Sequence, residues 1–258
     1  MQVIAIDIPE DHGYLIPVGD LHRGDRHLTQ RGLDKLKGYL EWVKERANAI
    51  VFLMGDVLNV ASRDSKSNPF ESQSGDDEYA KSVQLFKPYA RQIVGCITGN
   101  HEQRMYRQFG FNPLQPFCNE LGIQYCGFSA VLKIRIGKRA DRANEYEQTY
   151  WGFAHHGNGG GSTLGGALNR KTKLQEVVHG MDFYMAGHDH NLIVGTRNIL
   201  LPKRDKIVHQ RVHFIDTGSF LDWDGSYAEE AAFHISKQGA PRLRFDGRKR
   251  QHDLHVSI

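Results

Sequence analysis

The chain has 258 residues, of which 40% are hydrophobic and 24% are charged. These values are typical of a globular protein with a sizeable buried core, and they exclude a disordered or fibrous chain. The formal charge of +3 favours anionic partners slightly, but it is too small for a dedicated nucleic-acid-binding protein.

The cysteines and the apolar segments indicate the cellular compartment of the protein. Three cysteines without paired spacing argue against a disulfide framework or a cysteine-based zinc site. No segment approaches the ~20 apolar residues of a membrane span, and the N-terminal stretch lacks the basic-then-apolar pattern of a signal peptide. We therefore expect a cytoplasmic protein without a membrane partner, folded as a single domain over residues 1–258.

Three short apolar runs in the first half predict buried strands, at residues 14–20, 50–54 and 92–98. An amphipathic stretch over residues 29–47 predicts a helix after the first of them. Each run ends at Gly-Asp or Gly-Asn. Because ligands of parallel βαβ units bind at the carboxyl ends of the strands, these polar ends indicate a site.

The second half predicts more strands and a helix, with a polar hairpin tip at residues 137–144. We expect a helix over residues 164–179 and strands at residues 131–136, 148–154, 182–186, 192–199, 207–216 and 231–235. The fold class that follows is α/β: a four-layer α/β sandwich, in which two stacked mixed β-sheets are flanked by helices.

Residues 61–77 are rich in Ser, Asp and Asn and follow the second Gly-Asp directly. We interpret them as a mobile loop insertion. Such a loop is either a plain surface insertion or a lid that selects the substrate, since loops beside strand ends often carry function.

Five blocks of Asp, His and Asn, mostly at strand ends, indicate a metal site. They are Asp20-Leu21-His22, Gly55-Asp56, Gly99-Asn100-His101-Glu102, His155-His156-Gly157 and Gly187-His188-Asp189-His190. Residues two apart in an extended segment point the same way, so the Asp-x-His and His-x-His spacings each present two donors. Mixed oxygen and nitrogen donors favour a transition metal. We interpret the glycines before the donors as permitting tight turns.

The blocks resemble the signature of the calcineurin-like metallophosphoesterases, which runs D-x-H, G-D, G-N-H-D/E, H and G-H-x-H. The resemblance spans residues 20–190, and Asp216-Thr217-Gly218-Ser219 resembles the family's trailing N-P-G-S turn. It implies that Asp20, His22 and His190 hold one metal ion, that Asn100, His188 and either His155 or His156 hold another, and that Asp56 bridges them. We favour His155 because it follows its predicted strand directly, although His156-Gly157 matches the family's common His-Gly dipeptide.

The resemblance also implies the cofactors and the chemistry. We expect two divalent metal ions, with manganese favoured and iron, zinc and magnesium as alternatives. Two ions about 3.5–4 Å apart can clamp a phosphoryl group and lower the pKa of a bridging water towards ~7. His101 matches the family's general acid, which protonates the leaving oxygen.

One departure from the family argues against a Ser/Thr protein phosphatase. Where those enzymes have G-D-x-V-D-R-G, Asn59 replaces the second Asp and no Arg follows. Arg23 and Arg104, each just after a metal block, are the candidates to bind phosphate instead, and Asn59 is also a candidate to contact the substrate. Gly159 and Gly160, in the glycine-rich run 157–163, are candidates to cradle a phosphate, although the run lacks the Gly-Lys-Ser/Thr ending of a nucleotide triphosphatase.

These features predict a metal-dependent phosphodiesterase or nuclease. Its partner would be a phosphoester substrate, single-stranded or double-stranded nucleic acid included, and the basic residues Arg170, Lys171 and Lys173 suit such a polyanion. The alternative is a phosphomonoesterase or small-nucleotide phosphatase with the same two metals. A third hypothesis, a catalytically inactive binding scaffold, is disfavoured by the intact donor set.

Overall fold

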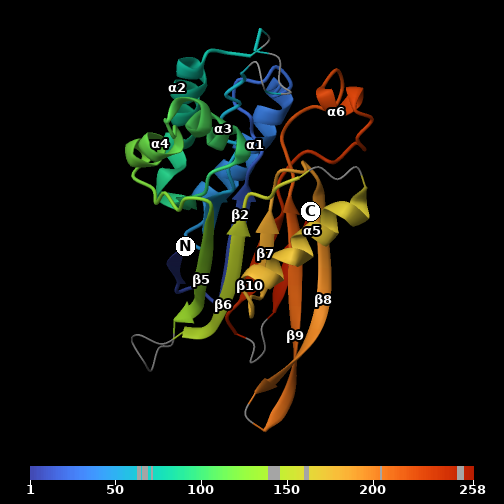
Figure 1. The fold of residues 1–258 in the computed structure, drawn as a ribbon. Coiled ribbons are helices and arrows are strands. Elements are labelled where there is room, and N and C mark those ends of the chain that lie inside the picture. Colours follow the sequence, from blue (N-terminus) through green and yellow to red (C-terminus); the bar gives the residue numbers. More distant parts are fainter. Residues whose placement is uncertain are drawn as a thin grey trace.

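The structure is a computed structural model that describes the chain except for residues 63–64, 66–68, 71, 139–145, 160–162, 204 and 249–252. Its strands form two sheets (Figure 1). The five-stranded sheet has the order β11-β10-β2-β3-β4 and consists of β11 (Leu254–Ser257), β10 (Arg242–Asp246), β2 (His12–Val18), β3 (Ala49–Leu53) and β4 (Ile93–Cys96). Strands β2, β3 and β4 run parallel, and β10 is antiparallel to both of its neighbours.

The six-stranded sheet has the order β1-β5-β6-β7-β9-β8. It is also mixed, since β5–β6 and β8–β9 are antiparallel hairpins and the other neighbours are parallel. Its strands are β1 (Gln2–Ile8), β5 (Ser129–Lys138), β6 (Tyr146–His155), β7 (Phe183–Ala186), β8 (Leu192–Lys203) and β9 (Lys206–Thr217).

The helices lie on the outer faces of the two sheets. Helices α1 (Gln30–Lys44), α2 (Gly75–Phe86) and α4 (Leu114–Leu121) share a hydrophobic cluster with the five-stranded sheet, and α5 (Leu164–Val177) shares another with the six-stranded sheet. A third cluster joins the two sheets. The predicted four-layer architecture is therefore confirmed. The remaining helices are η1 (Lys87–Gln92), α3 (Asn100–Phe109) and α6 (Tyr227–Glu230).

Helix α1 shows how local sequence produces one of these layers. Thr29 caps it by accepting a hydrogen bond from the Gly32 amide. Leu36, Leu40 and Val43 recur at helical spacing and are buried against the sheet. The predicted helix over residues 29–47 is thus observed, slightly shortened at its C-terminal end.

Two predictions about the chain's organisation differ from the structure. Residues 231–235 are not a strand: they follow α6, where Ala232 has a φ of 52° and Phe233 donates to the Ala228 carbonyl, which turns the chain. Residues 75–77 of the predicted loop already belong to α2, because Ser74 caps that helix. The mobility predicted for this loop concerns a segment that lies partly outside the described residues.

The parallel strands β2, β3, β6, β7 and β9 bring their carboxyl ends to the same end of the molecule. Figure 1 shows helices α1, α2, α3 and α6 at that end, and the β8–β9 hairpin extending to the opposite one. None of the helices within the described part of the chain has the length and apolar character needed to cross a membrane.

Candidate metal centre

All five predicted blocks meet where these strands end. Asp20 and Asp56 follow the neighbouring strands β2 and β3, and Asn100 opens α3 just after β4. His156 and His188 follow β6 and β7 of the other sheet. The site therefore lies between the two sheets and takes donors from both.

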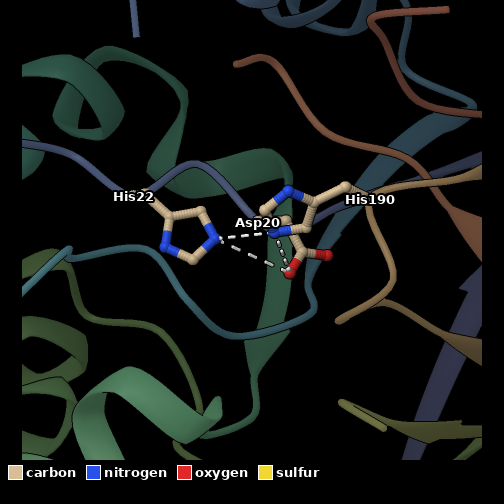
Figure 2. Close-up of side chains that lie close together, drawn as sticks. All are labelled: Asp20, His22 and His190. Atoms are coloured by element: carbon tan, nitrogen blue, oxygen red, sulfur yellow. Dashed lines mark hydrogen bonds and ion pairs between the residues drawn. The ribbon is translucent and has the colours of Figure 1, made fainter. Parts of the chain in front are cut away.

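A first donor set comprises Asp20, His22 and His190, which converge in Figure 2. The Nε2 atoms of His22 and His190 lie 3.0 Å apart, and His190 Nε2 lies 3.5 Å from Asp20 Oδ1. Burial lowers the pKa of His22 and brings that of His190 to about 4, which favours neutral rings. Two neutral imidazoles whose Nε2 lone pairs point at each other repel, so this arrangement fits a cation bound between the two nitrogens.

A second donor set comprises Asp56, Asn100, His156 and His188. Asn100 Oδ1 lies 2.6 Å from His188 Nδ1 and 2.9 Å from His156 Nε2. Asp56 Oδ2 lies 3.2 Å from His156 Nε2 and 3.8 Å from His22 Nε2. Asp56 is thus within reach of both sets, as a bridging ligand must be.

The electrostatics of the site also fit metal cations. Asp20 and Asp56 are only 0% and 1% exposed. Burial raises the pKa of Asp20 well above its usual value. Burial also disfavours the charged form of Asp56, but the neighbouring His156 and His101 outweigh it and hold the pKa of Asp56 well below its usual value. Burial likewise opposes a charge on His156, yet Asp56 and Asp20 raise its pKa to about 10. Buried carboxylates require such compensation, and the mixed oxygen and nitrogen donors suit a transition metal.

The backbone of the donors is held in an uncommon conformation. Asp20, His22, Asp56, His188 and His190 have φ values of 49°, 48°, 49°, 73° and 56°. Left-handed backbone at a residue other than glycine costs on the order of 1–3 kcal/mol, and such strain is concentrated at functional sites. The donors are therefore positioned by turns that the surrounding structure enforces.

The comparisons with known proteins agree with this geometry. A family model described as calcineurin-like phosphoesterase matches residues 16–192. The chain belongs to this family. The predicted resemblance is thereby confirmed, and the donor groups described above are those expected of a dimetal-dependent phosphoesterase.

Three solved structures are similar to this calcineurin-like phosphoesterase at low identity. A conserved uncharacterized protein of Streptococcus pneumoniae, titled a predicted phosphoesterase, and a metallophosphoesterase of Sphaerobacter thermophilus have 12% and 11% identity; each match covers 95% of this chain and 88% of the other, with a TM-score of 0.38. The calcineurin-like phosphoesterase YfkN of Bacillus subtilis has 11% identity over 97% of this chain and 91% of its own, with a TM-score of 0.42. No curated protein matches the chain.

The preference for His155 over His156 was wrong as a matter of geometry. His155 is still the last residue of β6, paired with Ser129, and its Nδ1 accepts a hydrogen bond from the Gly157 amide. His156 is the residue that contacts Asp56 and Asn100, while its Nδ1 donates to the Met54 carbonyl. Adjacent residues of an extended strand point to opposite sides, so only one of the two can face the donors.

Most of the glycines before the donors are required because neighbouring atoms lie where a side chain would be. Of the four, Gly55 alone has a positive φ, 88°. A Cβ on Gly99 would overlap the Asp56 carboxylate, and one on Gly187 would overlap the Asp20 carboxylate. The expectation of tight turns therefore holds for Gly55, whereas Gly99 and Gly187 need a missing side chain, as does Gly19, where a Cβ would lie 2.8 Å from the Met54 Cβ.

Residues 101 and 102 support the Asp56 turn. The His101 amide donates to Asp56 Oδ1 at 2.8 Å, and the His101 Nδ1 donates to the Asn59 carbonyl at 2.5 Å. Glu102 is fully buried and accepts hydrogen bonds from the backbone amides of Asp56, Leu58 and Gly99. Burial lowers the pKa of His101, and the Asp56 carboxylate opposes that shift.

A pocket of about 400 Å³ opens over the two donor sets. Among the predicted substrate-binding residues, Arg104 and Gly159 line it, and Gly160 lies outside the described residues. Asn59 and Arg23 do not line it, and a substrate-binding role for either stays a prediction. The Asn59 side chain is buried and donates to Ser72 Oγ, while the backbone of Arg23 pairs with Leu58 and carries the chain past the site.

The predicted basic cluster on α5 is also different from expectation. Lys171 is only 2% exposed and binds Asp189, Asp216 and the Gly187 carbonyl. Arg170 donates to Asp189 Oδ1 at 2.7 Å. Arg170 and Lys171 therefore hold the turn between His188 and His190, whereas Lys173 is exposed. Binding of a polyanion by this helix stays a prediction.

Sequence reasoning missed the far side of the pocket. It is lined by residues 25 and 27 and by residues 219–238, including Trp223, Phe233 and His234. Asp25-Arg26-His27 repeats the Asp-x-His spacing of the first block, which is a signal that could have identified it. Ser219, in the trailing turn, donates to the Asp20 carbonyl at 2.9 Å, but the aromatic residues after it carry no recognisable motif.

Replacing His156 with Ala should abolish binding of one metal ion, because this side chain contacts both Asp56 and Asn100. The loss of metal affinity should exceed the roughly 10–100-fold typical of losing a residue that only supports a ligand. His155→Ala is the matched control and should keep both ions. Metal content measured by mass spectrometry after dialysis checks this; a larger loss in the His155 variant would reverse the assignment.

Replacing Gly99 with Ala should displace Asp56 and lower both metal content and activity, since the new methyl group would overlap the carboxylate. Gly38→Ala, in α1, is the control because a Cβ there meets no atom within 4 Å. That change should be neutral or stabilise the helix by up to about 1 kcal/mol. Thermal unfolding and metal content should be measured on both, and a fully metal-loaded, active Gly99 variant would contradict the expectation.

Proposed function

We propose that this calcineurin-like phosphoesterase hydrolyses phosphodiester bonds in nucleotides or nucleic acids, with two divalent metal ions and with manganese favoured over iron, zinc and magnesium. One observation carries the proposal: Asp56 lies within reach of both donor sets, in a pocket that also contains His101 and Arg104. The three residues serve different steps of one reaction.

The donor sets assign the ligands. Asp20, His22 and His190 would hold one ion, and Asn100, His156 and His188 the other, with Asp56 between them. When bound, two such ions clamp a phosphoryl group and supply an activated water as nucleophile. No side chain of the protein has to form a covalent intermediate.

His101 is suited to protonate the leaving oxygen. Its Nδ1 is held by the Asn59 carbonyl, and its Nε2 lies 3.9 Å from Asp56 Oδ2, on the side of the donor sets. A bound phosphate anion favours the protonated imidazole, which counteracts the lowering of its pKa by burial. In this arrangement a backbone carbonyl takes the part that a second Asp takes in the protein phosphatases.

The charges in the pocket favour a diester over a monoester. Near the donor sets, the described lining contains one arginine, Arg104, and its Nη2 also donates to the carbonyls of Asn59 and Val60. A diester carries one negative charge, which such a partly engaged guanidinium matches better than the two charges of a monoester. A pocket of about 400 Å³ suits one nucleotide or the end of a single strand better than a double strand.

The alternative is a phosphomonoesterase or small-nucleotide phosphatase, and the pocket volume of about 400 Å³, which suits one small ligand, is the observation that favours it. No described residue between 61 and 77 lines the pocket. An inactive scaffold is less favoured, since every donor required by the family is present.

A substrate panel tests the proposal. With Mn²⁺ added, bis-p-nitrophenyl phosphate should be hydrolysed faster than p-nitrophenyl phosphate, and cyclic nucleotides and single-stranded DNA should be compared in the same buffer. Cleavage of DNA, if observed, should fall as salt rises. The reverse ranking of the two synthetic esters would establish the monoesterase, and no hydrolysis of any member would favour the scaffold.

Replacing His101 with Ala should lower turnover by about 10²–10⁴-fold, the usual contribution of a general acid. Metal content should stay near normal, because the His101 ring is not required to complete either ligand set. The exposed His179→Ala variant is the control for loss of an imidazole elsewhere. Loss of metal together with activity would show that His101 is a ligand or a structural residue instead.

A further inference from the structure

The pocket has a second side that the donor sets do not explain. Residues 221–238, called here the C-terminal wall, line it together with the metal-binding residues. The wall lies beyond residues 16–192, which the family model covers. Figure 1 shows α6, which belongs to this wall, at the same end of the molecule as α1 and α3.

Hydrogen bonds hold the wall in place. The Asp222 amide donates to the His27 carbonyl at 2.8 Å, and Gln238 Nε2 donates to the Phe220 carbonyl at 3.3 Å. Ser236 Oγ accepts from the Leu192 amide at 3.0 Å. These contacts tie both ends of the wall to the body of the protein, so its shape is set before any ligand binds.

The Trp223 side chain is bound to the backbone of a second aromatic residue of the wall, Phe233. Trp223 Nε1 donates to the Phe233 carbonyl at 2.8 Å, so the two halves of the wall are linked across α6. Both residues are half-buried and line the pocket. Aromatic faces at the edge of a phosphate site are the usual means of stacking the base of a nucleotide.

His234 supplies a polar group without a partner. It lines the same pocket, and its Nε2 is buried without a hydrogen-bond partner among the described residues. A buried polar atom left unpaired costs free energy, and a ligand that binds in the pocket can satisfy it. The wall therefore combines stacking surface with an unused hydrogen-bonding position.

We propose that the C-terminal wall is a nucleobase-binding site, in which Trp223 and Phe233 stack on the base and His234 Nε2 binds its polar edge. The inference rests on the proposed function, which places the phosphate of the same nucleotide at the two donor sets. A pocket of about 400 Å³ accommodates a single small ligand of this kind. The base comes either from a mononucleotide ester or from the end of a single strand.

The test is a binding measurement, which is independent of turnover. Adenosine 5′-monophosphate and ribose 5-phosphate, which differ by the base, are titrated into manganese-loaded protein by calorimetry, and free phosphate is assayed to exclude hydrolysis. The nucleotide should bind at least about fivefold more tightly, the lower limit for one stacked base. Equal binding of the two ligands would overturn the proposal.

Two variants assign any selectivity to the wall. Trp223→Ala and Phe233→Leu should each reduce the preference for the nucleotide while leaving the affinity for ribose 5-phosphate within about twofold of the native protein. The second variant keeps the backbone carbonyl that Trp223 binds. Phe109→Leu, at an exposed aromatic residue that does not line the pocket, is the matched control and should keep the preference. An equal loss for both ligands in both wall variants would make the wall structural and contradict the proposal.

A third titration distinguishes the source of the base. Thymidine 5′-monophosphate and pentathymidylate are compared: tighter binding of the strand identifies a strand end, and comparable binding identifies a mononucleotide, both supporting the site. Base-dependent binding in a protein that hydrolyses no phosphoester would keep this inference and overturn the proposed function. Hydrolysis without base-dependent binding would do the opposite.

Discussion

The burial of two carboxylates, Asp20 and Asp56, is the constraint on which this site depends. Parallel strands β2 and β3 deliver them to the same edge of one sheet, where almost no solvent reaches them. Uncompensated charges in such a position are very costly, so the neighbouring residues must supply or hold positive charge. His156, contributed by the second sheet, does so in the absence of metal, because Asp56 and Asp20 raise its pKa to about 10. Imidazoles are also the ligands that a transition metal prefers.

The turns that carry these donors are strained, and hydrogen bonds hold them. The amides of Leu21 and His22 both donate to the Asp56 carbonyl, which joins the first two blocks through the backbone. The Glu102 carboxylate accepts hydrogen bonds from three backbone amides next to Asp56 and Asn100. Lys171 forms an ion pair with Asp189, which lies between His188 and His190. Charged residues that resemble substrate-binding groups in the sequence are thus part of the support of the site.

The two sides of the pocket have different origins. The donor side uses segments that the family model covers, and its chemistry follows from the ligand set. The opposite side consists mainly of residues after 192, together with Asp25 and His27, and its aromatic and polar groups lie outside the two donor sets. The metal-donor residues and most of the opposite side therefore come from different parts of the chain.

The sequence by itself determined the sheet strands of the βα units, the position of α1 and the five blocks, because hydrophobic periodicity and the Asp-x-His and Gly-Asn-His patterns are local. It also supported the family, which the later comparison confirmed. It did not identify β10 and β11, which are short and become strands by pairing with each other and with β2.

Tertiary structure alone decided which of several similar residues serves the site. His155 and His156 are indistinguishable by composition, and the end of β6 selects His156. Arg170 and Lys171 look like free cations in the sequence until Asp189 and Asp216, from the other side of the fold, neutralise them. The aromatic wall has no local pattern at all, because its role arises only where residues 221–238 fold back over strand ends that lie up to about 200 positions earlier in the chain. Side-chain direction and long-range pairing are set by packing, and packing is what a single sequence does not display.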